Sequence, residues 1–248
     1  MHRFYLPPPE ISENGVSFSK EAAGKISRVL RLRPGAKVFV FDGLGVEWEV
    51  LLTQVSPAMV KGDITARTEK KEKAPRILIG QGLPKSSKMD FIVQKATELG
   101  VHSVIPLSLE RCVVKVQGEK NRVQRWQRIG AESAEQCGRC TLPRISAPCG
   151  IGQFCEMTKG ADLKIVLWER ETETFLREFL TKGNQTPLDV AVVIGPEGGI
   201  GEEEVENLKK SGFIPVGLGG NVLRTETAAL SVLSIIQFYF GCLGGKKE

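Results

Sequence analysis

Short apolar runs alternate with amphipathic segments over most of the chain, and this alternation sets the expected fold. From residue 76 onward, runs of aliphatic and β-branched residues are each followed by apolar residues at helical spacing. We expect strands at 76–80, 103–107, 163–168, 190–194 and 214–218. We expect helices at about 87–99, 121–136, 174–181, 202–210 and 225–240. This pattern is typical of an α/β fold with a mostly parallel sheet.

The beginning of the chain has a different pattern, with short strands and one helix at about 19–30. Strands are expected at 37–42, 47–52 and 59–65, the first two joined by a glycine-containing turn. We therefore predict a small β-rich domain at 1–70. The charged, proline-terminated segment 71–75 is the expected linker, and 76–248 the α/β domain.

Two glycine-rich loops follow the last two expected strands. The first contains Gly195, Gly198 and Gly199, and the second contains Gly219 and Gly220. Glycine lets the backbone approach a ligand closely and donate its N–H groups. Because ligands of open α/β sheets bind at the carboxyl ends of the strands, these loops predict a binding site. Two purely structural turns are the alternative interpretation.

The loops do not match the common nucleotide-binding motifs. No lysine follows either loop as a phosphate-binding loop requires, and the dinucleotide fingerprint is absent. Gly80 and Gly82 imitate its beginning, but Lys85 occupies the position of its third glycine. The expected ligand is therefore neutral or zwitterionic and is held largely by main chain.

The composition excludes few classes of protein and is compatible with a nucleic-acid partner. The chain has 248 residues, a net charge of +5 and a pI near 8.9. Such mild basicity is compatible with RNA binding and also with many metabolic enzymes. No apolar run reaches the roughly 20 residues of a membrane span, and the first residues contain no apolar signal-peptide core. We expect a cytoplasmic protein without membrane association.

The cysteines do not predict a metal site. Cys137 and Cys140 form a C-x-x-C at the end of an expected helix, but no second ligand pair has similar spacing. His2 and His102 are the only histidines in the sequence. We expect reduced thiols and no metal, with zinc or redox chemistry as the less favoured alternative.

Several motifs in order give the chain a resemblance to a known family. They are I-G-P-E-G-G (194–199), L-G-x-x-V-L-R-T-E-T-A (218–228), the segments 88–101, 106–111 and 125–139, and the N-terminal H-R-F-Y and R-V-L-R-L-R-P-G-A. Together they resemble the SPOUT methyltransferases of the RsmE type, which methylate N3 of a uridine in 16S ribosomal RNA. The resemblance covers nearly the whole chain, although Val222 and Cys137 stand where isoleucine and serine are usual.

The resemblance implies a fold and its partners. It implies a deep trefoil knot in the C-terminal SPOUT domain, with S-adenosylmethionine (SAM) bound in the knot loops, and a PUA-like N-terminal β-barrel that binds RNA. The implied partner is 16S ribosomal RNA or the small ribosomal subunit. The last expected helix is apolar on most sides, which favours a homodimer over a monomeric core helix.

The implied site residues come from the two loops and from basic side chains. The expected cofactor-binding residues are Gly195, Pro196, Glu197, Gly198, Gly199, Leu218, Gly219, Leu223, Arg224 and Thr227. Arg224 is the first catalytic candidate, because a cation would stabilise the uracil as N3 loses its proton. Glu197 and Glu226 are alternative bases. The RNA-binding candidates are Arg3, Arg28, Arg31 and Arg33, followed by Lys88, Lys95 and Arg111.

Two other functions stay open on the sequence alone. A SPOUT 2′-O-ribose methyltransferase would share the knot, but that branch carries an asparagine near the position of Arg224. A non-catalytic RNA-binding protein would keep the N-terminal arginines and fail to bind SAM.

Overall fold

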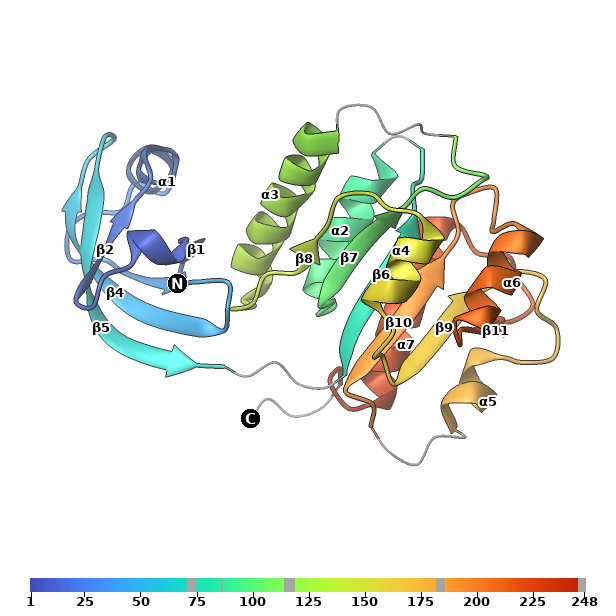
Figure 1. The fold of residues 1–248 in the computed structure, drawn as a ribbon. Coiled ribbons are helices and arrows are strands. Elements are labelled where there is room, and N and C mark those ends of the chain that lie inside the picture. Colours follow the sequence, from blue (N-terminus) through green and yellow to red (C-terminus); the bar gives the residue numbers. More distant parts are fainter. Residues whose placement is uncertain (71–74, 86, 114–118, 182–185, 245–248) are drawn as a thin grey trace. The chain divides into compact units, whose positions relative to one another are not determined.

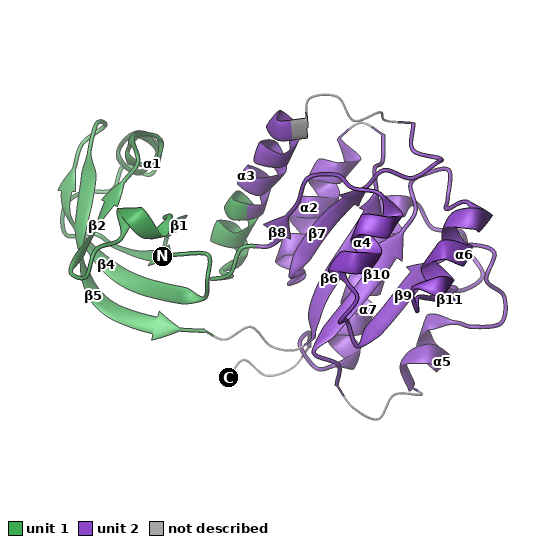
Figure 2. Cartoon of the chain, in the orientation of Figure 1, with its two compact units in different colours: residues 1–72, 131–142 green, residues 73–130, 143–248 purple. Residues whose placement is uncertain are grey.

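The computed structural model describes residues 1–70, 75–85, 87–113, 119–181 and 186–244. The chain forms two compact units (Figure 2). Unit 1 comprises Met1–Glu72 and Ala131–Leu142, and unit 2 comprises Lys73–Gly130 and Pro143–Glu248. Most of the predicted linker lies outside the described residues. The domain boundaries at residues 70 and 76 stay a prediction. Unit 1 contains the segment Ala131–Leu142 in addition to the N-terminal residues.

Unit 1 is built on a five-stranded sheet of order β1-β3-β4-β5-β2. Its strands are β1 (Arg3–Tyr5), β2 (Gly15–Phe18), β3 (Lys37–Phe41), β4 (Val46–Val55) and β5 (Val60–Glu69). The β1–β3 pair is parallel and the other pairs are antiparallel. Two irregularities in the β4–β5 register bend these long strands, as β-bulges do (Figure 1). The curved sheet agrees with the predicted β-rich barrel domain, although the order runs from β1 to β2 without closure among the described strands.

The core of unit 1 follows the two-residue period of its strands. Alternate residues point to one side of the sheet and are buried, whereas their neighbours are more exposed. The buried strand residues are Phe4, Val16, Phe18, Val38, Val40, Val50, Leu52 and Val60. This alternation explains why the hairpin of β3 and β4 could be predicted from the sequence.

The predicted helix 19–30 is divided in the structure. A short 3-10 helix (Pro8–Glu10) precedes it, and α1 (Lys20–Gly24) is capped by the Ser19 hydroxyl, which accepts from the Ala22 N–H. The chain then widens into a π-helical turn, Lys25–Val29. Arg31 follows in the left-handed conformation (φ 54°) and ends the helix. Helical periodicity alone does not reveal such a change of winding.

The segment Ala131–Leu142 is joined to the rest of unit 1 by charged groups. Buried Glu47 of β4 accepts from Arg3 Nε (3.0 Å) and Lys70 Nζ (3.1 Å). The Cys140 thiol donates to the same carboxylate across 3.4 Å. Glu135 accepts from the Tyr5 N–H and from Lys25 Nζ. These contacts fix the segment to the strands of unit 1.

Unit 2 contains a six-stranded sheet of order β11-β9-β10-β6-β7-β8, in which every pair is parallel. The strands are β6 (Arg76–Gly82), β7 (Ser103–Leu107), β8 (Arg144–Ile145), β9 (Leu163–Leu167), β10 (Asp189–Ile194) and β11 (Ile214–Val216). The parallel α/β prediction is therefore confirmed.

Helices cover both faces of this sheet (Figure 1). They are α2 (Lys88–Glu98), α3 (Glu119–Cys137), α4 (Ile151–Met157), α5 (Leu176–Thr181), α6 (Glu202–Lys210) and α7 (Thr225–Tyr239). In β10, Val190, Val192 and Ile194 face the cluster of α2 and α7, whereas Ala191 and Val193 face that of α4 and α6. Burial on both faces explains the uninterrupted apolar run. None of the described helices is long and apolar enough to cross a membrane.

Candidate functional site

A cavity of about 500 Å³ lies at the carboxyl ends of three neighbouring strands, β9, β10 and β11. Its size is in the range of small-molecule and cofactor sites. It is lined by Lys88, Leu167, Trp168, Glu169, Glu171, Ile194, Gly195, Pro196, Glu197, Gly198, Gly199, Val216, Gly217, Leu218, Gly219, Gly220, Asn221, Val222, Leu223, Arg224, Thr225 and Ala228. The two glycine loops therefore meet around one space, as their positions after parallel strands predicted.

The first loop folds tightly on itself after β10. The Gly199 N–H donates to the Pro196 carbonyl (3.0 Å), and Gly199 has a positive φ of 73°. A Cβ at Gly195 would meet Ile200 Cγ1 at 2.9 Å, and one at Gly199 would collide with the Glu169 carboxylate. Glycine is thus required here by backbone conformation and by space.

Glycine is required in the second loop for a different reason. Gly219 has φ 123°, which L side chains rarely adopt, but no protein atom lies within 4 Å of a Cβ built there or at Gly220. Gly217 is held at both its groups, since its N–H donates to Thr174 and its carbonyl accepts from Leu176. The loop is anchored at its beginning, while its middle leaves backbone exposed beside the cavity.

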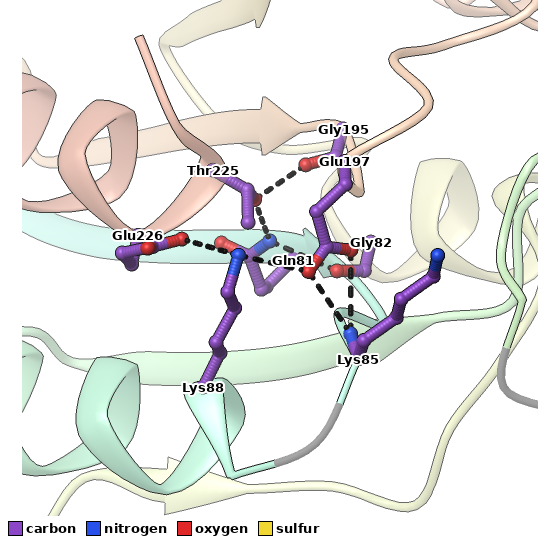
Figure 3. Close-up of polar contacts among 8 residues, drawn as sticks. All are labelled: Gln81, Gly82, Lys85, Lys88, Gly195, Glu197, Thr225 and Glu226. Carbon is purple, nitrogen blue, oxygen red and sulfur yellow. Dashed lines mark hydrogen bonds and ion pairs between the residues drawn. The ribbon is translucent and has the colours of Figure 1, made fainter.

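A chain of hydrogen bonds connects the first loop to the start of α7 (Figure 3). The fully buried Gln81 of β6 donates through Nε2 to the Gly82 carbonyl and to Thr225 Oγ1, both at 2.9 Å. The Thr225 hydroxyl then donates to the Gly195 carbonyl at 2.6 Å. Sequence reasoning missed this connection because Gln81 lay in a segment considered only as a failed dinucleotide motif.

Lys88 and two glutamates form a second connection across the same segments (Figure 3). Lys88 Nζ, on the first residue of α2, lies 3.0 Å from Glu197 Oε1 and 3.2 Å from Glu226 Oε2. Glu197 also accepts from the Lys85 N–H at 3.2 and 3.3 Å. The carboxylate of the first loop is therefore held by one side chain and one backbone group of the segment that leads into α2.

These contacts keep the lysine and Glu197 charged. The hydrogen bond to Glu197 raises the pKa of Lys88 above its usual value against the opposing effect of desolvation, and Glu226 raises it further. Burial is the largest single effect on Glu197 and would raise its pKa, but backbone hydrogen bonds and Lys88 outweigh it, so the pKa of Glu197 lies below its usual value. Glu197 is consequently a weak proton acceptor at neutral pH.

Arg224 differs from its charged neighbours at the cavity. It is exposed, lines the cavity and stands at the N-cap position of α7, where its carbonyl accepts from the Ala228 N–H. Its guanidinium makes no ion pair or hydrogen bond with any residue that the structure describes. The side chain is therefore available to a ligand in the cavity.

The predicted cofactor residues are brought together with one exception. Nine of the ten, from both loops, line the cavity; Thr227 lies exposed in the first turn of α7 and does not. The sequence reasoning missed the contribution of β9, whose carboxyl end supplies Trp168, Glu169 and the following Glu171. The strand itself was predicted, but its place between β10 and β11 was not.

The predicted RNA-binding residues are divided between the two units. Arg28, Arg31 and Arg33 are exposed near the π-helical turn of unit 1. Three others have partners within the protein: Arg3 pairs with Glu47, Lys95 pairs with Glu98, and Arg111 donates to the Gly198 carbonyl at 3.1 Å. Lys88 belongs to the cavity, as described above.

The two cysteines of the C-x-x-C segment differ in exposure. Cys137 is exposed and Cys140 is buried, and all six cysteines are free thiols. Burial, with Glu47 adding to it, raises the pKa of the Cys140 thiol and keeps it protonated. No group of three or more potential ligand side chains in the described ranges could hold a metal ion.

Comparison with known proteins places this architecture in a family. Residues 71–237 match the RNA methyltransferase domain family, and residues 26–57 match the RNA methyltransferase PUA domain. The ribosomal RNA small subunit methyltransferase E of Bacillus subtilis is 33% identical over 239 residues, covering 92% of both chains. That of Synechocystis is 33% identical over 95% of this chain and 77% of its own.

The fold comparison agrees. The crystal structure of a ribosomal RNA small subunit methyltransferase E from Neisseria gonorrhoeae, bound to S-adenosyl methionine, superposes with a TM-score of 0.84. It is 30% identical and is matched over 96% of this chain and 97% of its own. Sequence, fold and both domains thus lead to one assignment: the chain belongs to the ribosomal RNA small subunit methyltransferase E family.

Proposed function

We propose that this protein is a SAM-dependent methyltransferase that methylates N3 of a uridine in 16S ribosomal RNA. The names of the relatives support small-subunit ribosomal RNA as the substrate, and the SAM-bound structure from Neisseria gonorrhoeae supports SAM as the cofactor. The uridine and its N3 atom come from the family resemblance and from the chemistry of the site. A location in the cytoplasm, with the ribosomal substrate, completes the proposal.

The cavity fits SAM on features of this chain. Its volume of about 500 Å³ suits a ligand of that size. Gly219 and Gly220 leave backbone uncovered beside it, while Leu167, Ile194 and Val216 give it apolar walls. When bound, SAM supplies an activated methyl group for a single displacement. The protein's own task is then to position the nucleobase and to stabilise the charge that develops on it.

The observation that carries the proposal is the unpaired guanidinium of Arg224 at this cavity. N3 of uracil is an imide nitrogen that must lose its proton before it can accept a methyl group. A guanidinium beside O2 or O4 would stabilise the resulting anion and lower the pKa of N3. Arg224 is therefore the catalytic residue in this proposal.

The two alternative bases are less suitable. Glu197 and Glu226 are both paired with Lys88, and the pKa of Glu197 lies below its usual value. A general base works best with a pKa near the operating pH, which is far above that of a stabilised carboxylate. We propose that Glu197 and Glu226 have structural roles in the site and that the proton of N3 passes to solvent.

RNA binding is proposed for unit 1. The match to the RNA methyltransferase PUA domain and the exposed Arg28, Arg31 and Arg33 support it. Arginine suits phosphate because its planar fork donates two parallel hydrogen bonds. Because N3 is on the Watson–Crick edge, the target uridine must be unpaired or flipped out when it enters the cavity.

Two further features of the proposal concern the α/β domain. We infer a trefoil knot in its C-terminal segment, on the strength of the family resemblance. We also infer a homodimer, supported by large apolar side chains that α7 exposes: Ile235 (42%), Phe238 (69%) and Tyr239 (43%). An exposed apolar helix face of this kind is typical of an interaction surface.

The direct test is product analysis. Purified protein is incubated with small subunits or 16S ribosomal RNA and labelled SAM, and the digested nucleosides are identified by mass spectrometry. Label in N3-methyluridine supports the proposal. Label in a 2′-O-methylribose would instead assign the protein to the ribose-methylating branch. Absence of both SAM binding and label would identify a non-catalytic RNA-binding protein.

A further inference from the structure

Two carboxylates lie on the segments that surround Arg224, and both are paired with one lysine. Glu197 lines the same cavity as Arg224, and Glu226 follows Arg224 by two positions in the first turn of α7. Lys88 Nζ is 3.0 Å from the first and 3.2 Å from the second. The three side chains are 32%, 28% and 17% exposed, so solvent screens their charges only in part.

The glutamate on α7 has few other partners. Its Oε2 atom is buried and makes no regular hydrogen bond, so its approach to Lys88 is an ion pair held by charge. Glu197 has the Lys85 N–H in addition, but Lys88 is the cation that neutralises it. Without Lys88, Glu197 at the cavity and Glu226 in the first turn of α7 would both lack a positive partner among the described residues.

An unpaired carboxylate attracts a free guanidinium, and Glu197 lines the same cavity as Arg224. Arginine forms short, bidentate pairs with carboxylates, and such a pair would hold Arg224 away from a substrate. Lys88 is well placed to prevent this, since it is on the first turn of α2, and α2 and α7 pack in one apolar cluster. The helix that carries Lys88 is therefore held against the helix that carries Glu226.

We propose that Lys88 is a positioning residue: by pairing with Glu197 and Glu226 it leaves the Arg224 guanidinium free to meet the substrate. This deepens the proposed function and rests on it, because the substrate group at Arg224 is the nucleobase. Lys88 acts through the two carboxylates and does not need to touch RNA, in contrast to its predicted role in RNA binding.

The first test is kinetic. Lys88→Met removes the charge and keeps the length of the side chain, so kcat for methyl transfer should fall on the order of tenfold, with a smaller change in the KM for SAM. Lys88→Arg keeps a cation within reach of both carboxylates and should retain most of the activity. Equal losses in both variants would contradict a role that depends on charge.

A double-mutant comparison separates the two possible roles of Lys88. In a Glu197→Gln/Glu226→Gln background the carboxylates that Lys88 holds are neutral, so adding Lys88→Met should change kcat by less than about twofold. The same loss of activity in both backgrounds, with a salt dependence of RNA binding that weakens on Lys88→Met, would show that Lys88 binds RNA directly. That outcome overturns the proposal.

A measurement that does not depend on activity is the titration of the Glu197 carboxylate. In protein labelled at glutamate carboxyl carbons, NMR titration should show a higher pKa for Glu197 in Lys88→Met than in the parent protein. Lys37→Met, which breaks the Lys37–Glu49 pair in unit 1, is the matched control and should leave the Glu197 titration unchanged. An unchanged Glu197 titration in Lys88→Met refutes the proposal. None of these measurements depends on which nucleoside is methylated, so they are separable from the test of the proposed function.

Discussion

The hydroxyl of Thr225 donates a 2.6 Å hydrogen bond to the carbonyl oxygen of Gly195 and accepts another from Gln81 Nε2. One buried side chain thereby joins β6, the loop after β10 and the first turn of α7. These segments carry Glu197 and Arg224. The geometry of the cavity therefore depends on hydrogen bonds within the protein, which form without a bound ligand. The site is organised by the protein itself.

Replacing this hydroxyl should loosen the cavity. Thr225→Val keeps the shape of the side chain but leaves the Gly195 carbonyl and one N–H of the Gln81 amide without their partner, which should cost about 1–3 kcal/mol of unfolding free energy. Chemical denaturation measures this cost, and calorimetry should show weaker binding of S-adenosylhomocysteine. Thr181→Val, at the exposed end of α5, is the control and should change stability little. Equal stability of the two variants would contradict the role of Thr225.

The local pattern of the sequence predicted the elements of unit 2 well. β7 was predicted to the residue because a parallel strand that is buried on both faces is mostly apolar, and only Ser103 of its five residues is polar. α6 was also predicted to the residue, because Gly201 precedes it and three acidic residues occupy its first turn. The short α4 and β8 were missed, since α4 has no side-chain cap and spans two turns.

The candidate site was predictable only where local sequence determines it. Glycines at 195, 199 and 219 are demanded by local backbone conformation or space, and they were identified. Lys88 was expected to bind RNA, because its helical position gives no sign of a partner within the protein. Its pairing with Glu197 depends on β6 lying next to β10, a strand order that periodicity does not determine.

The first glycine loop should tolerate no side chain. Gly199→Val imposes a β-branched residue on a positive φ and on the space beside Glu169, so SAM affinity measured by calorimetry should fall at least tenfold. Gly219→Val should act similarly through φ alone. Gly152→Ala in α4, where a Cβ meets no atom within 4 Å, is the control and should bind SAM normally. Unchanged affinity in both loop variants would remove SAM from this cavity.

The arginines of unit 1 should govern the salt dependence of RNA binding. Arg31→Glu and Arg33→Glu, made singly, should each weaken RNA binding and reduce the slope of log K against log salt by about one phosphate contact. Lys61→Glu on β5 reverses a charge in the same unit and should change the slope less. Slopes equal to that of the parent protein would move the RNA site away from these two arginines.

The exposed apolar side chains of α7 should mark the dimer interface. Phe238 is 69% exposed, and Phe238→Asp would place a charge where a second subunit packs. Light scattering at micromolar concentration should report a dimer for the parent protein and a monomer for the variant. Asn207→Asp, at an exposed position of α6, tests whether any added charge has this effect. A parent protein that is monomeric at this concentration would exclude the interface.

Arg224→Ala should lower turnover far more than it lowers cofactor affinity. The guanidinium has no partner among the described residues, so its removal disturbs no internal contact. If it stabilises the anion that forms as N3 loses its proton, the loss in kcat/KM for RNA corresponds to about 2–4 kcal/mol of transition-state stabilisation. Calorimetry should meanwhile give SAM affinity within a few-fold of the parent.

The pH dependence makes this prediction specific. Without a cation at O2 or O4, the pKa of N3 in the bound uracil rises, so the alkaline increase in the rate of Arg224→Ala should shift to higher pH. Arg224→Lys retains a positive charge but lacks the planar guanidinium. Its rate should therefore increase at a pH between the values for the parent protein and for Arg224→Ala. A variant that loses SAM affinity and kcat together, with an unshifted pH profile, would show that Arg224 holds the cofactor instead of the nucleobase.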